Sequence, residues 1–330
     1  MLNKNKKNNC IPIIDIKDLL RKDSGKVNLI AHAISNACKS TGFFYIVNHG
    51  ISPTLIKQVF EESKLFFSKS TEEKLAMDIT KSSHMRGYFA IEEEKPEYEA
   101  KGDLKEGFDM ALDLPLNDPD VMRSTPLYGP NIWPVGQVDF KEVMTEYHTK
   151  MLDLGRTLLT AFARGLGMPD NFFEDKVKKP LAQLRLLHYP PQQGPITRVQ
   201  MGAGEHTDFG CITLLAQDDI GGLEVLNKEG KWVEVQPIPF SFIVNIGDLM
   251  SRWTNDLYPA TLHRVINKSP HDRYSIVFFL DPDYHVEINC LTTCVSDTYT
   301  AKYPPITVGK YMQARFDATF NFRTLKKQKR

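Results

Sequence analysis

The sequence predicts an α+β protein with a mainly β core in its C-terminal half. Amphipathic helical patterns dominate the first half of the 330-residue chain, and after Pro180 the pattern changes to short β-type runs. Seven such runs follow with turn residues between them: "LAQLRLLHY", "CITLLAQ", "GLEVLN", "KWVEVQ", "SFIVNIG", "LHRVIN" and "RYSIVFFL". Strands of this length and spacing are typical of a sandwich, a barrel or a jelly roll. We therefore expect a helical and mixed N-terminal half to support a β core.

The N-terminal half combines strand and helix patterns. "IPIIDI" (residues 11–16) and "GFFYIVNHG" (residues 42–50) are β-type runs bounded by turn residues. "STEE" at residues 70–73 is a capping box, and the many Pro, Gly and acidic residues of segment 79–135 predict loops around short elements. Apolar residues at helical spacing predict helices over residues 24–40, 52–68 and 140–166.

The change of pattern near residue 180 also suggests how the chain is organised. We expect a mixed α/β region over residues 10–180 and the β core over residues 181–320. The basic ends, residues 1–9 and 321–330, lack an apolar pattern to bury, and we expect them to be disordered.

Composition excludes several classes of function. The chain has 41 basic and 41 acidic residues, so its net charge gives no argument for binding nucleic acid or a membrane surface. No apolar run approaches the roughly 20 residues that span a bilayer, and no signal-peptide core precedes the first strand. The five cysteines are odd in number and scattered, which predicts a reducing, cytoplasmic setting. We expect a monomer that acts on a small molecule.

The motif "HTD" suggests a metal site. On an extended segment, residues two apart point to the same face, so His206 and Asp208 could reach one ion together. A third ligand must come from elsewhere, and "LYPATLHRVIN" offers His263 on a later strand. Two imidazoles and one carboxylate form the facial triad of non-haem Fe(II) oxygenases. The alternative is an ordinary hydrogen-bonded pair between His206 and Asp208.

A strand farther along carries a candidate anion site. In "RYSIVFF", the side chains of Arg273, Ser275, Val277 and Phe279 alternate onto one face. An arginine that faces a β core without a partner is costly, and a carboxylate would satisfy it in bidentate fashion with the serine hydroxyl as a further donor. Tyr189, at the end of "LRLLHY", could donate to the same carboxylate. The alternative is an edge arginine paired with an acidic side chain.

These motifs together resemble those of the iron/ascorbate-dependent oxidoreductases, the 2-oxoglutarate/Fe(II)-dependent dioxygenases that include isopenicillin N synthase-like enzymes. The resemblance covers roughly residues 11–320. It rests on "HTD", the histidine of "LHRVIN", "RYS", and the opening runs "IPIIDI" and "GFFYIVNHG". It implies a double-stranded β-helix (jelly roll) core that binds Fe(II) through His206, Asp208 and His263.

The resemblance also implies a reaction. 2-Oxoglutarate would bind the iron, with its distal carboxylate held by Arg273 and Ser275 and with Tyr189 assisting. Its oxidative decarboxylation to succinate would be coupled to oxidation of an unidentified small molecule, with ascorbate as a possible reductant. Two alternatives stay open. One is an oxidase of the isopenicillin N synthase type, which binds its substrate without 2-oxoglutarate. The other is an inactive binding protein, although the complete ligand set argues against it.

The substrate pocket is the least determined part of the site. Its candidates are aromatic and basic residues near the motifs or in the N-terminal half: Phe209, Phe279, Arg86, Phe89, Phe108 and Arg252.

Overall fold

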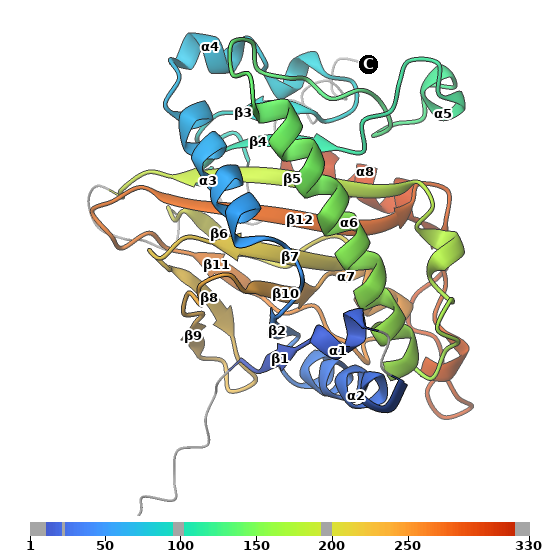
Figure 1. Cartoon of the computed structure of the whole chain (residues 1–330). Helices are drawn as coiled ribbons and strands as arrows, with labels where there is room; N and C mark the ends of the chain where they lie inside the picture. Colours follow the sequence, from blue (N-terminus) through green and yellow to red (C-terminus); the bar gives the residue numbers. More distant parts are fainter. Residues whose placement is uncertain (1–10, 22–23, 95–101, 193–199, 321–330) are drawn as a thin grey trace, which may run out of the picture.

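The computed structural model describes residues 11–21, 24–94, 102–192 and 200–320. The two basic ends lie outside these ranges. Figure 1 shows a layered arrangement in which long helices cross one side of a large sheet and a smaller sheet lies behind it. This is the jelly-roll core that the family resemblance implied.

The large sheet has eight strands and takes members from both halves of the chain. In their order across the sheet they are β1 (Ile13–Asp15), β2 (Phe43–Val47), β10 (Phe242–Ile246), β7 (Ile212–Gln217), β12 (Arg273–Asp283), β5 (Pro180–Tyr189), β4 (Glu106–Ala111) and β3 (Gly87–Phe89). The β core therefore includes strands from before residue 180, because N-terminal strands extend the sheet at both edges. All pairings in it are antiparallel except that of β1 with β2.

The small sheet has four strands, in the order β6 (Ala203–His206), β11 (His263–Val265), β8 (Leu223–Leu226) and β9 (Trp232–Glu234). A separate hairpin joins β13 (Glu287–Ile288) and β14 (Ile306–Thr307). Each of the seven β-type runs predicted after Pro180 contains a strand. The strand β4 was not anticipated as part of the core, because its sequence "EGFDMA" carries a glycine and two acidic residues.

Helices cover the outer face of the large sheet. The longest, α6 (Phe140–Gly165), crosses β12 beside α3 (Pro53–Phe67) and α2 (Ser24–Ser40). All three match the predicted helices, and the capping box at Ser70 opens α4 (Thr71–Leu75) as expected. The remaining helices are short: α1 (Lys17–Leu20), α5 (Pro119–Met122), α7 (Asp248–Trp253), and the 3-10 turns η1 (Ile79–Lys81), η2 (Glu174–Lys176) and η3 (Thr292–Cys294).

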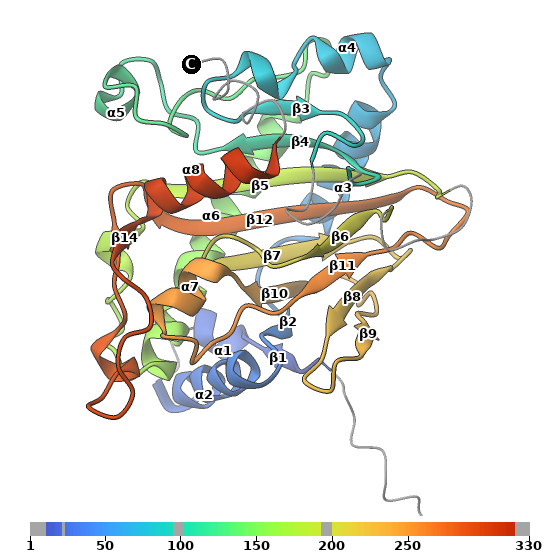
Figure 2. The ribbon, with the colours of Figure 1, turned by 180° about the vertical axis from the view of Figure 1, so that it is seen from behind.

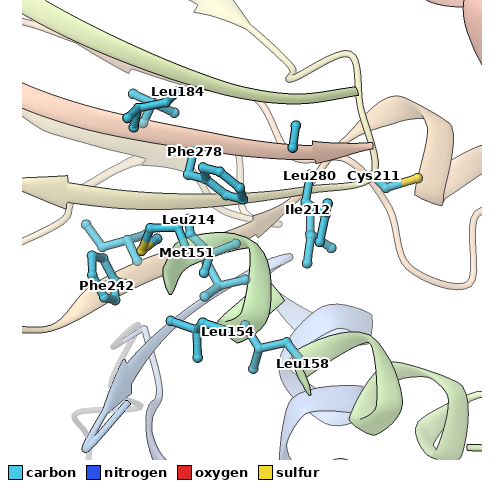
Figure 3. Close-up of a cluster of buried hydrophobic side chains, with 14 of the residues drawn as sticks. Met151, Leu154, Leu158, Leu184, Cys211, Ile212, Leu214, Phe242, Phe278 and Leu280 are labelled. Atoms are coloured by element: carbon cyan, nitrogen blue, oxygen red, sulfur yellow. The ribbon is translucent and has the colours of Figure 1, made fainter. Parts of the chain in front are cut away.

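The alternation of side chains along β12 separates the core from the interior of the jelly roll. Phe278 and Leu280 point toward α6, where they meet Met151, Leu154 and Leu158 (Figure 3). The alternate residues of β12 face the opposite side, toward the small sheet, and line the cavity there: Arg273, Ser275, Val277, Phe279 and Asp281. The hydrophobic layer under α6 thus fixes which side chains of β12 enter the site.

One further helix, α8 (Val308–Thr319), was not predicted. It packs along β12 on the side of the sheet away from α6, as Figure 2 shows. Its buried residues Val308, Met312 and Phe316 recur every four positions, which is the signal that sequence reasoning passed over. Among the described helices, none is long and apolar enough to cross a membrane.

Candidate active site

The three predicted ligands meet at the end of the small sheet. His206 is the last residue of β6 and His263 the first of β11, and the two are paired across the strands with ring centres 4.2 Å apart. The Oδ1 atom of Asp208 lies 3.9 Å from Nε2 of His206 and 3.5 Å from Nε2 of His263. Their ligand atoms all lie within 4.8 Å of one another, and no other such cluster of three exists in the described residues.

Asp208 reaches this point by a route that the sequence argument did not foresee. Because β6 ends at His206, Asp208 lies in the turn that follows the strand, and its side chain reaches the same cluster as that of His206. The turn is held by the N–H of Asp248, which donates to the Asp208 carbonyl at 2.8 Å. The carboxylate is fixed through Oδ2, which accepts from Thr213 at 2.5 Å and from Asn245 at 2.6 Å. Its Oδ1 remains directed at the two histidines.

Backbone carbonyls orient both imidazole rings. Nδ1 of His206 lies 2.7 Å from the carbonyl of Gly204, and Nδ1 of His263 lies 3.1 Å from that of Thr261. A carbonyl oxygen only accepts, so Nδ1 is the protonated nitrogen in each ring. The lone pair of each Nε2 is therefore free for a ligand at the centre of the cluster.

The electrostatics of the cluster suit a divalent cation. Burial, together with the nearby His263, lowers the pKa of His206 to about 4, so its ring is neutral at neutral pH. Burial by itself disfavours the Asp208 carboxylate, but His263 and the hydrogen-bond donors hold its pKa below the ordinary range. Burial likewise opposes charge on His263, yet Asp208 raises its pKa, which shows that positive charge is stabilised here. Two imidazole nitrogens and an ionised carboxylate fit Fe(II).

Arg273 is a buried cation without a counter-anion. Its side chain is 0% exposed, and no carboxylate of the described residues lies within ion-pairing distance of it. Its guanidinium donates to the Gly221 carbonyl at 2.5 Å and to Oε1 of Gln217 at 3.2 Å, and lies 3.5 Å from the Ser275 hydroxyl. Tyr189 is opposite in register and contributes its ring face, 4.7 Å from the guanidinium carbon. An uncompensated buried charge of this kind calls for an anionic ligand.

One cavity of about 680 Å³ joins these two features. It lies between the sheets and is lined by all three residues of the histidine–aspartate cluster, by Arg273 and Ser275, and by Tyr189. Its size is in the range of small-molecule sites. The fold therefore places a metal-type cluster and an anion site in a single cavity.

A network of buried charges forms another wall of the cavity. Nζ of Lys105 pairs with Asp103 and with Glu94, the latter at 2.8 Å. Arg185 pairs with the same Glu94 at 2.8 Å and, in bidentate fashion, with Asp109 at 2.7 and 2.8 Å. None of these residues was predicted. Their signal is weak in the sequence, because both pairs of Arg185 join segments far apart in the chain, at separations of 76 and 91 residues.

Two of the six predicted pocket residues line the cavity, namely Phe209 and Phe279. Phe89 and Phe108 do not, because both are fully buried in the core around the edge strands. The ring of Phe89 lies behind Arg185, 4.9 Å from its guanidinium carbon.

The two predicted basic residues also lie elsewhere. Arg252 stacks on Tyr303 at 4.5 Å and donates to the carbonyl of Pro304. Arg86 is buried beside the main cavity and lines a second space of about 20 Å³, where it donates to the carbonyl of Leu127 at 2.8 Å. Both were predicted as pocket residues, and their backbone and ring partners hold them outside the main cavity.

The helix α8 supplies lining residues that replace them. Met312, Arg315, Phe316 and Thr319 face the cavity, with Arg315 stacked on Phe209 at 4.3 Å. Gln217, the partner of Arg273, was also missed in the sequence. It ends "CITLLAQ" and could have been found from the register that pairs it with Ser275.

A jelly roll with two histidines and one carboxylate at one end, next to an enclosed anion site, defines the class of non-haem Fe(II) oxygenases. Comparison with known proteins narrows this class. Residues 11–136 match the family described as non-haem dioxygenase in morphine synthesis N-terminal, and residues 180–282 match the 2OG-Fe(II) oxygenase superfamily. The chain belongs to the 2OG-Fe(II) oxygenase superfamily and is a 2-oxoglutarate/Fe(II)-dependent dioxygenase.

Similar proteins cover nearly the whole chain. The 2-oxoglutarate-Fe(II) type oxidoreductase hxnY of Emericella nidulans is 35% identical over 314 residues, which is 94% of this chain and 90% of that protein. The clavatol oxidase claD of Penicillium crustosum is 37% identical over 329 residues, covering 94% and 96%. A full-length Neurospora crassa protein solved in complex with alpha-KG and thymine is 32% identical, covers 95% and 98%, and superimposes with a TM-score of 0.83.

Proposed function

We propose that His206, Asp208 and His263 bind the Fe(II) and that Arg273 and Ser275 bind the distal carboxylate of 2-oxoglutarate. The observation that carries this proposal is the fully buried Arg273, which forms no ion pair with the described residues and faces the same cavity as the histidine–aspartate cluster. Charge supports it too. One divalent cation and one guanidinium balance the Asp208 carboxylate and a dianionic co-substrate.

The roles of two neighbours follow from their contacts. Gln217 accepts a hydrogen bond from the guanidinium and so orients it toward the cavity. Tyr189 presents its ring to the guanidinium in a cation–π contact, and we propose that its hydroxyl assists in binding the same carboxylate. Both side chains leave the outer N–H groups of Arg273 to the co-substrate.

In the proposed reaction, 2-oxoglutarate and O₂ give succinate and CO₂ while one oxygen atom is inserted into a C–H bond of the substrate. Bound iron supplies the activation of O₂. Arg273 and Ser275 would hold the distal carboxylate of the co-substrate, and His206, Asp208 and His263 would hold the metal, in the same cavity. Ascorbate serves as an auxiliary reductant that keeps the iron in its ferrous state.

We further propose a cytoplasmic monomer that acts on a small molecule. Cys38, Cys211, Cys290 and Cys294 are free thiols in the described residues, which supports a reducing compartment. The cavity volume of about 680 Å³ supports a small substrate. Thymine, the ligand of the Neurospora crassa relative, is therefore one of the compounds to screen.

The experiment that tests the proposal separates it from an oxidase that needs no 2-oxoglutarate. Anaerobic protein is titrated with Fe(II) and then with 2-oxoglutarate, and the charge-transfer band of a chelated 2-oxo acid is followed. Oxygen is then admitted and succinate is measured. We expect one iron per chain, a saturable band and succinate release. Protein that binds iron but shows neither band nor succinate would contradict the use of 2-oxoglutarate.

A further inference from the structure

Asp281 is a buried carboxyl group with no ion-pair partner among the described residues, as Arg273 is a buried guanidinium without one. It lies on β12, its side chain is 2% exposed, and it lines the main cavity. Oδ1 accepts the backbone N–H of Cys211 at 2.6 Å, while Oδ2 has no hydrogen-bond partner in the described residues. No lysine, arginine or histidine of the described residues forms an ion pair with it, and burial, the main cause, raises its pKa to about 7.

The backbone around Asp281 leaves space for this carboxylate. A Cβ atom at Gly210 would lie 1.7 Å from Oδ1 of Asp281, so only glycine fits at that position. Gly210 comes two residues after Asp208, and both residues line the same cavity as Asp281. The hydrogen bond to Cys211 explains one oxygen of Asp281 and leaves the other, with its charge, unexplained.

Gln183 supplies a second polar group without a hydrogen-bond partner in the same cavity as Asp281. Gln183 lies on β5, directly across from Phe279, and lines both the main cavity and the small one that it shares with Asp281. Its Nε2 is buried without a hydrogen-bond acceptor, and its Oε1 accepts no hydrogen bond from the described residues. The amide can therefore turn its oxygen toward a donor on a ligand.

The charged wall offers no cation to offset these groups. Lys105 and Arg185 are shared among three carboxylates, Glu94, Asp103 and Asp109. Two further cations line the cavity: Arg273, which the proposed function assigns to 2-oxoglutarate, and Arg315, which stacks on Phe209. An anionic substrate would also meet Asp281. A cationic substrate would find an unpaired carboxylate.

We propose that the substrate carries a protonated nitrogen, an ammonium, amidinium or guanidinium group, that binds to Asp281 with Gln183 as a second acceptor. This inference rests on the proposed function, because it assigns the substrate end of the same cavity. The group donates to Oδ2 of Asp281 and to Oε1 of Gln183, and the rest of the molecule extends toward the metal past Phe279. Asp281 and Gln183 thus determine specificity and take no part in metal binding.

The test uses matched ligands that differ only in the polar group. Benzylammonium, benzamide and benzoate, and an aliphatic set of butylammonium, butyramide and butyrate, are titrated by calorimetry into the anaerobic Fe(II)–2-oxoglutarate protein. We expect the ammonium member of at least one set to bind about 10-fold or more tightly than its amide, and the carboxylate to bind weakest. Equal affinities, or tightest binding of the amide or carboxylate, would overturn the proposal, as would the absence of ammonium binding in both sets.

Two variants with opposite expected effects assign the preference to these residues. Asp281→Asn keeps an acceptor for the Cys211 N–H and should weaken ammonium binding about 10- to 100-fold. Gln183→Glu, which does not contact the Cys211 turn, should tighten it. Asp283→Asn is the matched control, because Asp283 lies on the same strand and accepts the backbone N–H of Lys179 at 2.8 Å but does not line the cavity.

The outcomes separate this inference from the proposed function. Iron content and the 2-oxoglutarate band are measured on every variant and should match the wild type. A wild-type band without an ammonium preference sinks the inference alone, whereas a missing band sinks the proposed function. Ammonium binding that both Asp281→Asn and Gln183→Glu leave unchanged would show that the nitrogen binds elsewhere, which would also contradict the inference.

Discussion

Replacement of Arg273 by alanine tests the co-substrate site most directly. The guanidinium is fully buried and its nearest partners are the Gly221 carbonyl, Gln217 and Ser275, none of them charged. If 2-oxoglutarate supplies the missing anion, truncation leaves a carboxylate buried without its partner, which typically costs about 2–5 kcal/mol. At about 1.4 kcal/mol per tenfold, the affinity for 2-oxoglutarate should fall roughly 30- to several-thousand-fold.

We expect the same substitution to have little effect on the stability of the protein. Without co-substrate, Arg273→Ala removes a buried charge that has no counter-ion, so the free energy of unfolding should change little in spite of the lost packing on Tyr189. Arg273→Lys should recover only part of the affinity, because an ammonium cannot reproduce the planar bidentate fork. Iron binding should survive both changes, since Arg273 is not a ligand.

The assay is titration of anaerobic Fe(II) protein with 2-oxoglutarate, following the charge-transfer band, with thermal unfolding recorded with and without the co-substrate. Arg123→Ala is the control, because that side chain is 74% exposed and its ion pair with Asp120 spans 3.8 Å. Arg273→Ala protein with wild-type affinity, or Arg273→Lys with full recovery, would refute the assignment. Loss of iron in Arg273→Ala would show that the cavity itself had rearranged.

Three further predictions concern the metal, the first strand and pH. Asp208→Ala should abolish stoichiometric Fe(II) binding with near-native circular dichroism, and iron titration that matches wild type would refute the ligand set. Deleting residues 1–9 should leave the thermal midpoint unchanged, whereas deletion through Ile16, which is 0% exposed, should lower it by several degrees; equal midpoints would contradict this. Burial lowers the pKa of His148 in the folded state. Below the unfolded value of about 6.5 the unfolded state therefore binds more protons, and stability falls as the pH is lowered. His148→Gln should flatten urea midpoints measured from pH 7.5 to 5, with His32→Gln as the exposed control, and an unchanged slope would show that other groups cause the loss.

Local periodicity determined most of the secondary structure in advance. The helices α2, α3 and α6 follow from apolar residues at helical spacing, and the seven β-type runs after Pro180 each contain a strand. The same reasoning oriented β12, because side chains alternate across a strand whatever it packs against. Arg273 and Ser275 could therefore be assigned to one face from the sequence.

The ligand residues were identifiable from their chemistry, but their arrangement was not. Two imidazoles and a carboxylate restrict which metal ions can bind, and this restriction follows from the residue types alone. The position of Asp208 depends instead on a turn held by Asp248, Thr213 and Asn245, which come from three other segments. No pattern within "HTD" encodes that support.

The substrate end of the cavity was decided almost entirely by tertiary structure. Arg185 finds Asp109 at a separation of 76 residues, and Cys211 finds Asp281 at a separation of 70. Sequence reasoning placed Phe89 and Phe108 in the pocket, and the fold buried both in the core. The physical reason is one of range. Backbone period and residue chemistry act within a few residues and can be read along the chain, whereas the partner of a buried charge is set by which strands come to lie side by side.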